Sequence, residues 1–309
     1  MSLEQQITAL VEASNNLTDA VNGKISEIDQ RVDQAEQEFE EFTTVDFPKR
    51  VQDAQTVTFF IDPVNGDDAN LGTSSSNAFK TVAPLYSKTY KSGAIYKDVT
   101  IAFKTGYEYD LNCSVYAIER INVHSWGGSS SSPGTLTLKQ VAHSEGYPTQ
   151  PFKAPFIYVN EGVNGARNTV LKTFEFPAGH SWPKGDGQSD AWIALSGAMF
   201  RDVEKLKLDG VHVELYDLPL ISQYMNGSMG ENASVGFVLA GSPAFYKKPA
   251  GPGSANYAHM PFLLSVYGPN AVPVDIASGG HVLAEGLTTF GELFNNLDHS
   301  NVRSTHTLS

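Results

Sequence analysis

The sequence lacks most features of secreted, membrane-spanning and nucleic-acid-binding proteins. Its single cysteine, Cys113, excludes an internal disulfide and any cysteine-based metal or redox motif, and we expect it to be a small buried residue. No apolar run approaches the ~20 residues that cross a bilayer. The N-terminus has no basic-then-apolar signal, so we expect synthesis in a cytoplasm without export by that route. Only 21 Lys and Arg stand against 34 Asp and Glu. Nucleic-acid binding is therefore not expected, because neutralising phosphates requires a cationic face.

Common motifs for catalysis and cofactor binding are missing as well. The eight histidines show none of the HxH, HxxxH or HExxH spacings of zinc sites. No Gly-x-Ser-x-Gly elbow and no phosphate-binding loop occurs. We therefore expect neither a metal nor a cofactor.

The first 46 residues lack proline and have the pattern of one amphipathic helix. They carry eleven acidic and two basic residues, a net −9 of the chain's −13. Apolar residues recur at steps of three and four, a heptad pattern with one stutter at Asn22-Gly23. The helix should end before Phe47-Pro48, because a residue that precedes proline is driven to extended geometry. The apolar positions are Leu3, Ile7, Leu10, Leu17, Val21, Ile25, Ile28, Val32 and Phe39.

Two arrangements of this helix compete. It could lie on the protein's own body, or several copies could wind into a coiled coil. The narrow seam and the acidic flanks favour self-association over contact with an acidic body. The succession Ile25, Ile28 and Val32 favours three strands over two, since β-branched residues at these core positions disfavour dimers. We therefore expect the nine seam residues to trimerise the chain.

After Gln55 the pattern changes to short alternating apolar runs separated by Gly, Asn, Ser and Pro. This period is typical of β-strands. Helices are expected only over residues 80–90 and 290–297. A sandwich or jelly roll would use hairpins, for which Asp209-Gly210 is the strongest signal. A parallel β-helix would use the same dipeptide as a corner, and long irregular inserts suit coils of about 20 or more residues.

Residues 59–85, here named the opening segment, run from an alternating strand into a loop rich in turn-forming residues. Their acidic residues do not follow the calcium-loop spacing, so we expect them to bond the nearby backbone. The order Asp62-Pro63, Asn65-Gly66, Asp68, Gly72-Thr73 and Phe79-Lys80-Thr81 resembles the start of pectate-lyase-like right-handed β-helices, above all those of bacteriophage tail fibres and tailspikes. The resemblance fades by about residue 139.

This resemblance implies a mainly β chain with a right-handed parallel β-helix, which the heptad pattern of residues 1–46 places after a trimeric α-helical coiled coil. Residues 1–46 would anchor it to a virion, 47–56 would be a linker and 57–240 the β-helix body. Residues 241–309 would form a C-terminal β region with long loops for capping or receptor contact. The stretch after Tyr267 looks too interrupted for regular coils.

The function implied is that of a homotrimeric phage tail fibre, assembled in the host cytoplasm and located in the virion. Its N-terminal helix would join tail or baseplate proteins, and its body would bind a host-surface polysaccharide or receptor. One alternative is a polysaccharide-degrading tailspike, either a hydrolase or a lyase. Another is a purely structural baseplate or collar fibre.

Candidate residues for these alternatives lie in the body. A hydrolase requires a carboxylate pair, and a lyase requires a base near acids. His212 and Glu214 share the strand face opposite the valines, although exposed polar residues on a half-buried strand have the same pattern. Aromatic residues between small ones could stack on sugars or pack within loops. The catalytic candidates are Asp186, Asp190, Glu204, Asp209, His212 and Glu214; the glycan-binding candidates are Trp182, Tyr246 and Tyr257.

Overall fold

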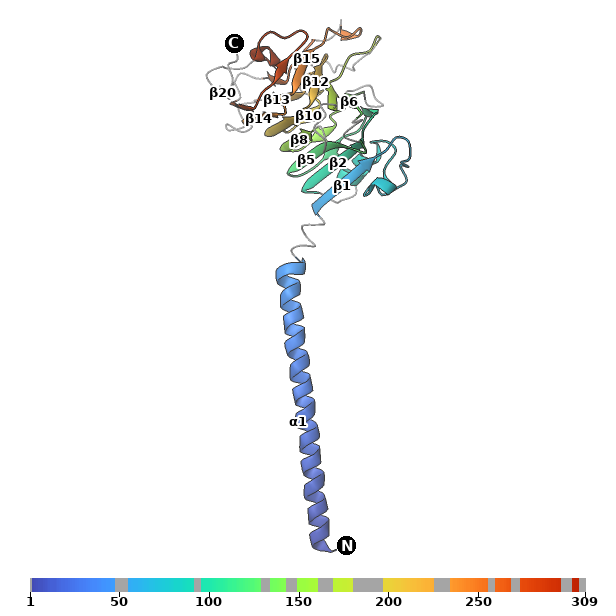
Figure 1. The fold of residues 1–309 in the computed structure, drawn as a ribbon, viewed down its shortest axis with the longest axis vertical. Coiled ribbons are helices and arrows are strands. Elements are labelled where there is room, and N and C mark those ends of the chain that lie inside the picture. Colours follow the sequence, from blue (N-terminus) through green and yellow to red (C-terminus); the bar gives the residue numbers. More distant parts are fainter. Residues whose placement is uncertain are drawn as a thin grey trace, which may run out of the picture. The chain divides into compact units, whose positions relative to one another are not determined.

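The computed structural model describes residues 2–47, 55–91, 96–128, 134–142, 149–160, 169–179, 197–224, 234–254, 259–267, 273–295 and 302–305. Contacts within the chain divide it into two units, Met1–Ala54 and Gln55–Ser309. The first is a helical rod and the second a β-sheet body (Figure 1).

The rod is one long helix, as its heptad pattern predicts. Helix α1 spans Leu3–Glu41, and the π-helical segment η1 continues it over Phe42–Asp46. A capping box begins it: the Gln5 backbone N–H donates to the Ser2 hydroxyl, and the Ser2 backbone N–H donates to the Gln5 side chain. Phe47 keeps helical geometry, with φ −66° and ψ −48°, and its N–H donates to the Phe42 carbonyl, so the expectation that the helix stops before Phe47 and that this residue is extended is wrong.

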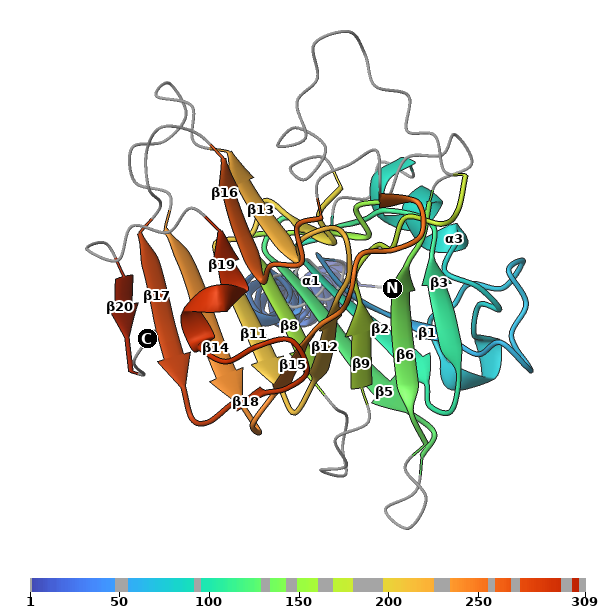
Figure 2. The ribbon, with the colours of Figure 1, turned by 90° about the horizontal axis from the view of Figure 1, so that it is seen from above.

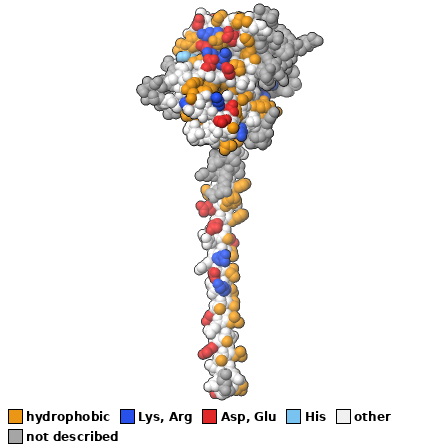
Figure 3. Space-filling view, turned by 90° about the vertical axis from the view of Figure 1, so that its right-hand side faces the viewer, with side chains coloured by type: hydrophobic (Ala, Val, Ile, Leu, Met, Phe, Trp, Pro, Cys, Tyr) orange, Lys and Arg blue, Asp and Glu red, His pale blue; other side chains and the backbone are white. Residues whose placement is uncertain are grey.

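The apolar seam of α1 has no partner within the rod. No described residue of α1 is buried, and all nine seam residues are exposed, from 48% at Val21 and Val32 to 74% at Leu3. Figure 3 shows hydrophobic side chains following one side of the helix along its length. Burying a large aliphatic side chain is worth about 1.5–3 kcal/mol, so the seam is a strong reason for the rod to associate.

The body is built from three sheets in which every strand pairing among the described residues is parallel. Sheet A has eight strands, and Figure 2 shows them side by side from β20 to β1. They are β1 (Thr56–Ile61), β2 (Asp98–Lys104), β5 (Arg120–Trp126), β8 (Phe156–Asn160), β11 (Lys205–Asp209), β14 (Val235–Ala240), β17 (Val274–Ser278) and β20 (Val302–Ser304).

Sheets B and C have six strands each. Sheet B contains β3 (Glu108–Leu111), β6 (Leu136–Gln140), β9 (Thr169–Lys172), β12 (His212–Leu215), β15 (Ala244–Lys247) and β18 (Val282–Leu283). Sheet C contains β4 (Val115–Tyr116), β7 (Phe152–Lys153), β10 (Phe200–Arg201), β13 (Ile221–Tyr224), β16 (Leu264–Tyr267) and β19 (Phe294–Asn295).

The chain visits the three sheets in a fixed order. From β2 to β19 it passes from sheet A to B to C six times within the described residues, and each strand pairs with the strand three further along. The hairpin interpretation of Asp209-Gly210 is therefore wrong. β11 and β12 belong to different sheets, and Gly210 turns the corner between them with φ +69°. Its N–H donates to the Ala240 carbonyl of the next round at 2.9 Å.

One continuous core fills the space between the sheets. Side chains alternate between this core and the outside along each strand. Leu208 of sheet A, Val213 of sheet B and Ile221 of sheet C are fully buried members of the same cluster. The intervening outward positions carry charged and polar side chains together with some apolar and aromatic ones, such as Val238, Phe156 and Tyr158.

The opening segment covers the first strand of this core. Phe79 is fully buried beside Phe59, with 5.8 Å between ring centroids, and its carbonyl accepts the Asp62 N–H. The Asp62 carboxylate accepts the N–H groups of Val64 and Asn65, and Asp68 accepts those of Lys80 and Thr81. The prediction that these acidic residues bond the backbone is confirmed.

Asp62 also holds the first two strands of sheet A together. Its side chain is 4% exposed and lies 2.7 Å from Lys104 Nζ. Burial alone would raise the pKa of Asp62, but the hydrogen bonds from Lys104, Asn65 and Val64 outweigh it and lower the pKa to about 2.

The two helices expected in the body are shorter than predicted. The helix expected at 80–90 is only α3 (Pro84–Tyr86) and the π-helical segment η3 (Ser87–Lys91), because Pro84 begins it late. The helix expected at 290–297 is the 3₁₀ turn η5 (Phe290–Leu293), after which Phe294 is extended and pairs in sheet C. A second 3₁₀ turn, η2, spans Ser75–Asn77.

The strands described after Tyr267 continue the regular order of the body, where the sequence suggested an interruption. β17 joins sheet A and β18 joins sheet B, in the same order as in every earlier round. The glycines between them sit at the corner: Gly279 N–H donates to the Leu239 carbonyl of the preceding round, and Gly280 has φ +140°. The Gly-Gly pair therefore forms a corner of the same kind as Gly210.

Candidate functional site

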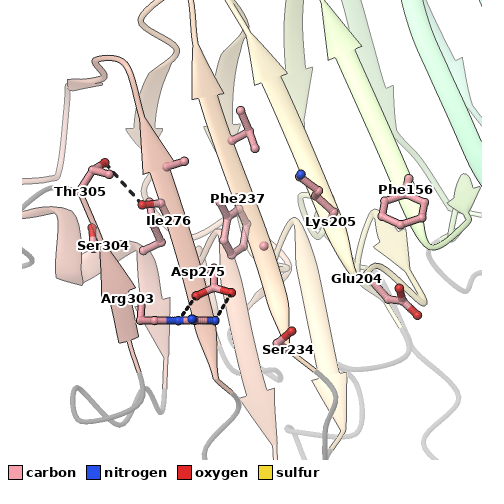
Figure 4. Close-up of a pocket in the computed structure, with 13 residues that line it drawn as sticks. Phe156, Glu204, Lys205, Ser234, Phe237, Asp275, Ile276, Arg303, Ser304 and Thr305 are labelled. Carbon is pink, nitrogen blue, oxygen red and sulfur yellow. Dashed lines mark hydrogen bonds and ion pairs between the residues drawn. The ribbon is translucent and has the colours of Figure 1, made fainter.

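The outward face of sheet A is hollowed across its later strands. A cavity of about 810 Å³ lies over β8 to β20 (Figure 4). The strand register explains it: Phe156, Lys205, Gly236, Asp275 and Arg303 lie next to one another on successive strands. Gly236 has no side chain, so the floor is lowest in the middle of this row.

A bidentate ion pair between Arg303 and Asp275 lies at one end of this hollow. The Arg303 guanidinium donates to both oxygens of Asp275, at 2.6 and 2.8 Å (Figure 4). Arg303 is 84% exposed and Asp275 44% exposed, so water screens the pair and its stabilisation is small.

A second hollow of about 460 Å³ continues toward β5 and shares Phe156 and Lys205 with the first. We call the two together the sheet A groove. Tyr158 and Lys207 form its wall: the Lys207 ammonium lies 4.3 Å from the centre of the Tyr158 ring. Asp209 joins them, accepting from the Tyr158 hydroxyl at 3.1 Å and lying 3.3 Å from Lys207. Burial by itself would lower the pKa of Lys207. The hydrogen bonds and charges of Tyr158 and Asp209 outweigh burial and raise this pKa.

Two catalytic candidates lie on this sheet, but they are separated. Glu204 lines the cavity, and its carboxylate points away from the Lys205 amino group (Figure 4). Asp209 is engaged at the opposite end of the same strand by Tyr158 and Lys207. Glu204 and Asp209 therefore do not form a facing pair of carboxylates.

The outward face of sheet B brings together a different set of the predicted site residues. His212 and Glu214 share the face opposite the buried Val213 and Leu215, as the alternation predicts. Tyr246 lies beside Glu214 in the register, with its ring 5.9 Å from the His212 ring. Three of the predicted site residues thus come together here.

The Glu214 carboxylate on sheet B is held by two neighbouring side chains, Tyr216 and Lys248. The Tyr216 hydroxyl donates to Glu214 at 3.1 Å, and Lys248 Nζ lies 3.8 Å from it. Burial and then the Glu214 charge raise the pKa of Tyr216 to about 12. Tyr216 thus stays a hydrogen-bond donor, and Glu214 serves as its acceptor.

The other four candidates, Asp186, Asp190, Trp182 and Tyr257, lie outside the described residues. Cys113 is only partly buried; its thiol contacts the Val82 carbonyl at 3.0 Å, and burial raises its pKa to about 12. The thiolate form, which is the nucleophile, is therefore strongly disfavoured.

Sequence reasoning missed a fully buried acid, Asp217. It accepts the N–H groups of Phe176 at 2.7 Å and Gly251 at 3.1 Å, and lies 2.9 Å from His259 Nδ1. These contacts join two other segments, the one after β9 and the connection between β15 and β16, to the Asp217 carboxylate. Nothing in the local pattern marks Asp217, because its partners come from distant parts of the chain.

Sequence reasoning also missed the sheet A groove. The signal present was the strand Phe156–Asn160, in which aromatic residues at two of the three outward positions, Phe156 and Tyr158, alternate with buried Ile157 and Val159. An aromatic residue on the outward side of an alternating strand is a feature that a contact surface would explain.

Within the described residues, no group of three or more His, Cys, Asp or Glu side chains is placed to hold a metal ion. No described helix is both long and apolar enough to cross a membrane. Comparisons with protein-family models, curated protein sequences and solved structures return no match.

Proposed function

We propose that this protein is the subunit of a homotrimeric bacteriophage tail fibre that attaches to a glycan or other receptor on the host-cell surface. In this proposal the body is a right-handed parallel β-helix. The rod is a three-stranded coiled coil that joins tail or baseplate proteins. The resemblance of the opening segment to phage tail fibres and tailspikes supplies the biological setting.

The observation that carries the proposal is the contrast between a complete body core and an uncovered rod. The six repeated passages through sheets A, B and C support a β-helix. The exposed heptad seam supports self-association. Together they match an elongated assembly with a helical stalk.

Attachment is favoured over a passive spacer by the sheet A groove. The groove is long, open and lined by aromatic rings beside charged groups, a combination suited to sugars, whose faces are apolar and whose edges are polar. Three copies would present three grooves, so weak single sites would gain avidity.

The test is binding of the labelled full-length protein to a panel of bacterial strains and to their purified surface polysaccharides. We expect saturable binding to at least one strain. We also expect a loss of affinity of roughly 100-fold or more when the rod is made monomeric, because multivalent binding gains on the order of 10²–10⁴. Ile25→Asp with Ile28→Asp is the variant to use.

Two outcomes would overturn the proposal. Failure to bind any strain, with the trimer intact, would favour a structural fibre. Release of new reducing ends or unsaturated sugars from a bound polysaccharide would instead identify a depolymerase.

A further inference from the structure

We propose that the sheet A groove binds an anionic glycan, with a sugar ring on Phe156 and its acidic group held by Arg120 and Lys205. This inference rests on the proposed function and specifies the chemistry of its ligand.

The strand register places these three side chains in one row. Arg120 on β5 pairs with Phe156 on β8, and Phe156 pairs with Lys205 on β11. Neighbouring strands lie ~4.8 Å apart, so the two cations flank the ring with their backbones about 10 Å apart. Phe156 is partly exposed, while Arg120 and Lys205 are exposed. An apolar face with a cation on each side is therefore open to solvent.

Neither cation has a close ion-pair partner among the described residues, although an acid lies near each: Asp98 pairs with Arg120 in the strand register, and Glu204 precedes Lys205 and lines the same cavity. Lys205 forms no ion pair within the described parts of the chain, and its stem lies beside Gly236. Arg120 reaches Glu119 only at 3.9 Å, and that carboxylate lies closer to Lys97, at 3.0 Å. The other cations of the groove are matched, Lys207 by Asp209 and Arg303 by Asp275.

The positive charge of Arg120 and Lys205 contrasts with the net negative charge of the molecule. The chain carries −13, of which residues 1–46 account for −9, so the remainder is −4. Two neighbouring cations without close ion-pair partners favour an anion over a neutral ligand at this row. Hydrogen bonds from Lys or Arg to carboxylate or phosphate are stronger than neutral ones, so the acidic group would supply most of the selectivity.

The neighbouring wall is already ordered for binding. Tyr158, Lys207 and Asp209 hold one another, so a ligand lying along the groove meets fixed groups instead of mobile ones. Preordered contacts lower the entropy cost of binding.

The experiment uses full-length protein and three immobilised probes: polygalacturonate, its fully methyl-esterified neutral form, and a poly(glycerol phosphate). We expect binding to the anionic probes at least tenfold tighter than to the neutral ester, and weakening as salt rises. The two anionic probes distinguish a carboxylate from a phosphate as the preferred group.

The matched variants are Lys205→Glu in the groove and Lys139→Glu on the outward side of sheet B. We expect Lys205→Glu and Phe156→Ala each to lower affinity for the preferred anion at least tenfold, while Lys139→Glu changes it less than twofold. Circular dichroism and sedimentation of each variant check that fold and oligomer are unchanged.

Equal binding of the neutral ester, or equal loss from the two Lys→Glu variants, would overturn the inference. So would a changed oligomeric mass in Lys205→Glu, because the groove would then be a contact between subunits. If the protein binds bacterial cells but neither anionic probe, this inference fails and the proposed attachment function stands. If it binds neither cells nor probes, both fail.

Discussion

The body buries its apolar side chains within one chain, whereas the rod leaves its apolar seam exposed. In the body, inward side chains of three sheets meet in one core, so the unit is complete within a single chain. In the rod, all nine seam residues are exposed and no described residue of α1 is buried. The difference teaches that one chain supplies a buried core for the body but leaves the apolar seam of the rod uncovered, which is why we propose that the rod associates with other copies. Breaking each unit should therefore have separate effects.

The largest effect is expected from charges in the seam. Ile25→Asp with Ile28→Asp would place six carboxylates in a three-stranded core, and each unpaired buried charge costs several kcal/mol. We expect a monomer with a weakened helical signal and an unchanged body, measured by sedimentation and circular dichroism. Ser26→Asp with Gln30→Asp adds the same charge outside the seam and should remain trimeric. A trimeric seam variant would contradict the coiled coil.

The second-largest effect is expected on the stability of the body. Asp217→Ala removes the acceptor for two backbone N–H groups and for His259. Breaking a buried charged network costs about 3–5 kcal/mol, so urea unfolding of the body should lose about that much. The control is Asp275→Ala, whose exposed pair with Arg303 should contribute less than about 1 kcal/mol. Equal losses for the two would show that Asp217 does not tie the loops.

A pH-dependent effect is expected at the start of sheet A. Because the folded pKa of Asp62 is lowered from 3.8 to about 2, its ionised form stabilises the fold above pH 4. That stability is lost as pH falls toward 2, and amounts to at most about 2 kcal/mol. We expect Asp62→Asn to be less stable at pH 7 and the gap to close by pH 2. A gap that stays constant with pH would exclude the linkage.

The smallest effect is expected at a corner between sheets. Gly210 has φ +69°, and an alanine there should cost about 1–2 kcal/mol. Gly236→Ala is the control, because its added Cβ would make only ordinary contacts, 3.6 Å from Glu204 O and Lys205 Cγ. It should be neutral in urea unfolding. Equal costs would show that the left-handed corner is not what requires glycine.

The sequence predicted the periodic parts of this fold well. The heptad steps predicted the long helix α1, and two-residue alternation predicted the outward face shared by His212 and Glu214. The turn-forming acids Asp62 and Asp68 also behave as expected. Apart from Asp68, whose partners Lys80 and Thr81 lie 12 and 13 residues away, these features depend on neighbours within a few residues, so local patterns are enough to find them.

Features that depend on the stacking of rounds could not be predicted. Arg120, Phe156 and Lys205 become neighbours only through the strand register, and Asp217 meets His259 across 42 residues. Phe294 pairs in sheet C because tertiary packing outweighs the helical pattern around it. The same stacking turns the glycines after Ser278 into a corner, where sequence alone suggested an interruption.

The most direct test of this account is the mass of the full-length protein by sedimentation equilibrium at micromolar concentration. We predict a single species of three times the chain mass of 33.4 kDa. A monomer that persists at high concentration would contradict the claim that the exposed seam of α1 joins three copies.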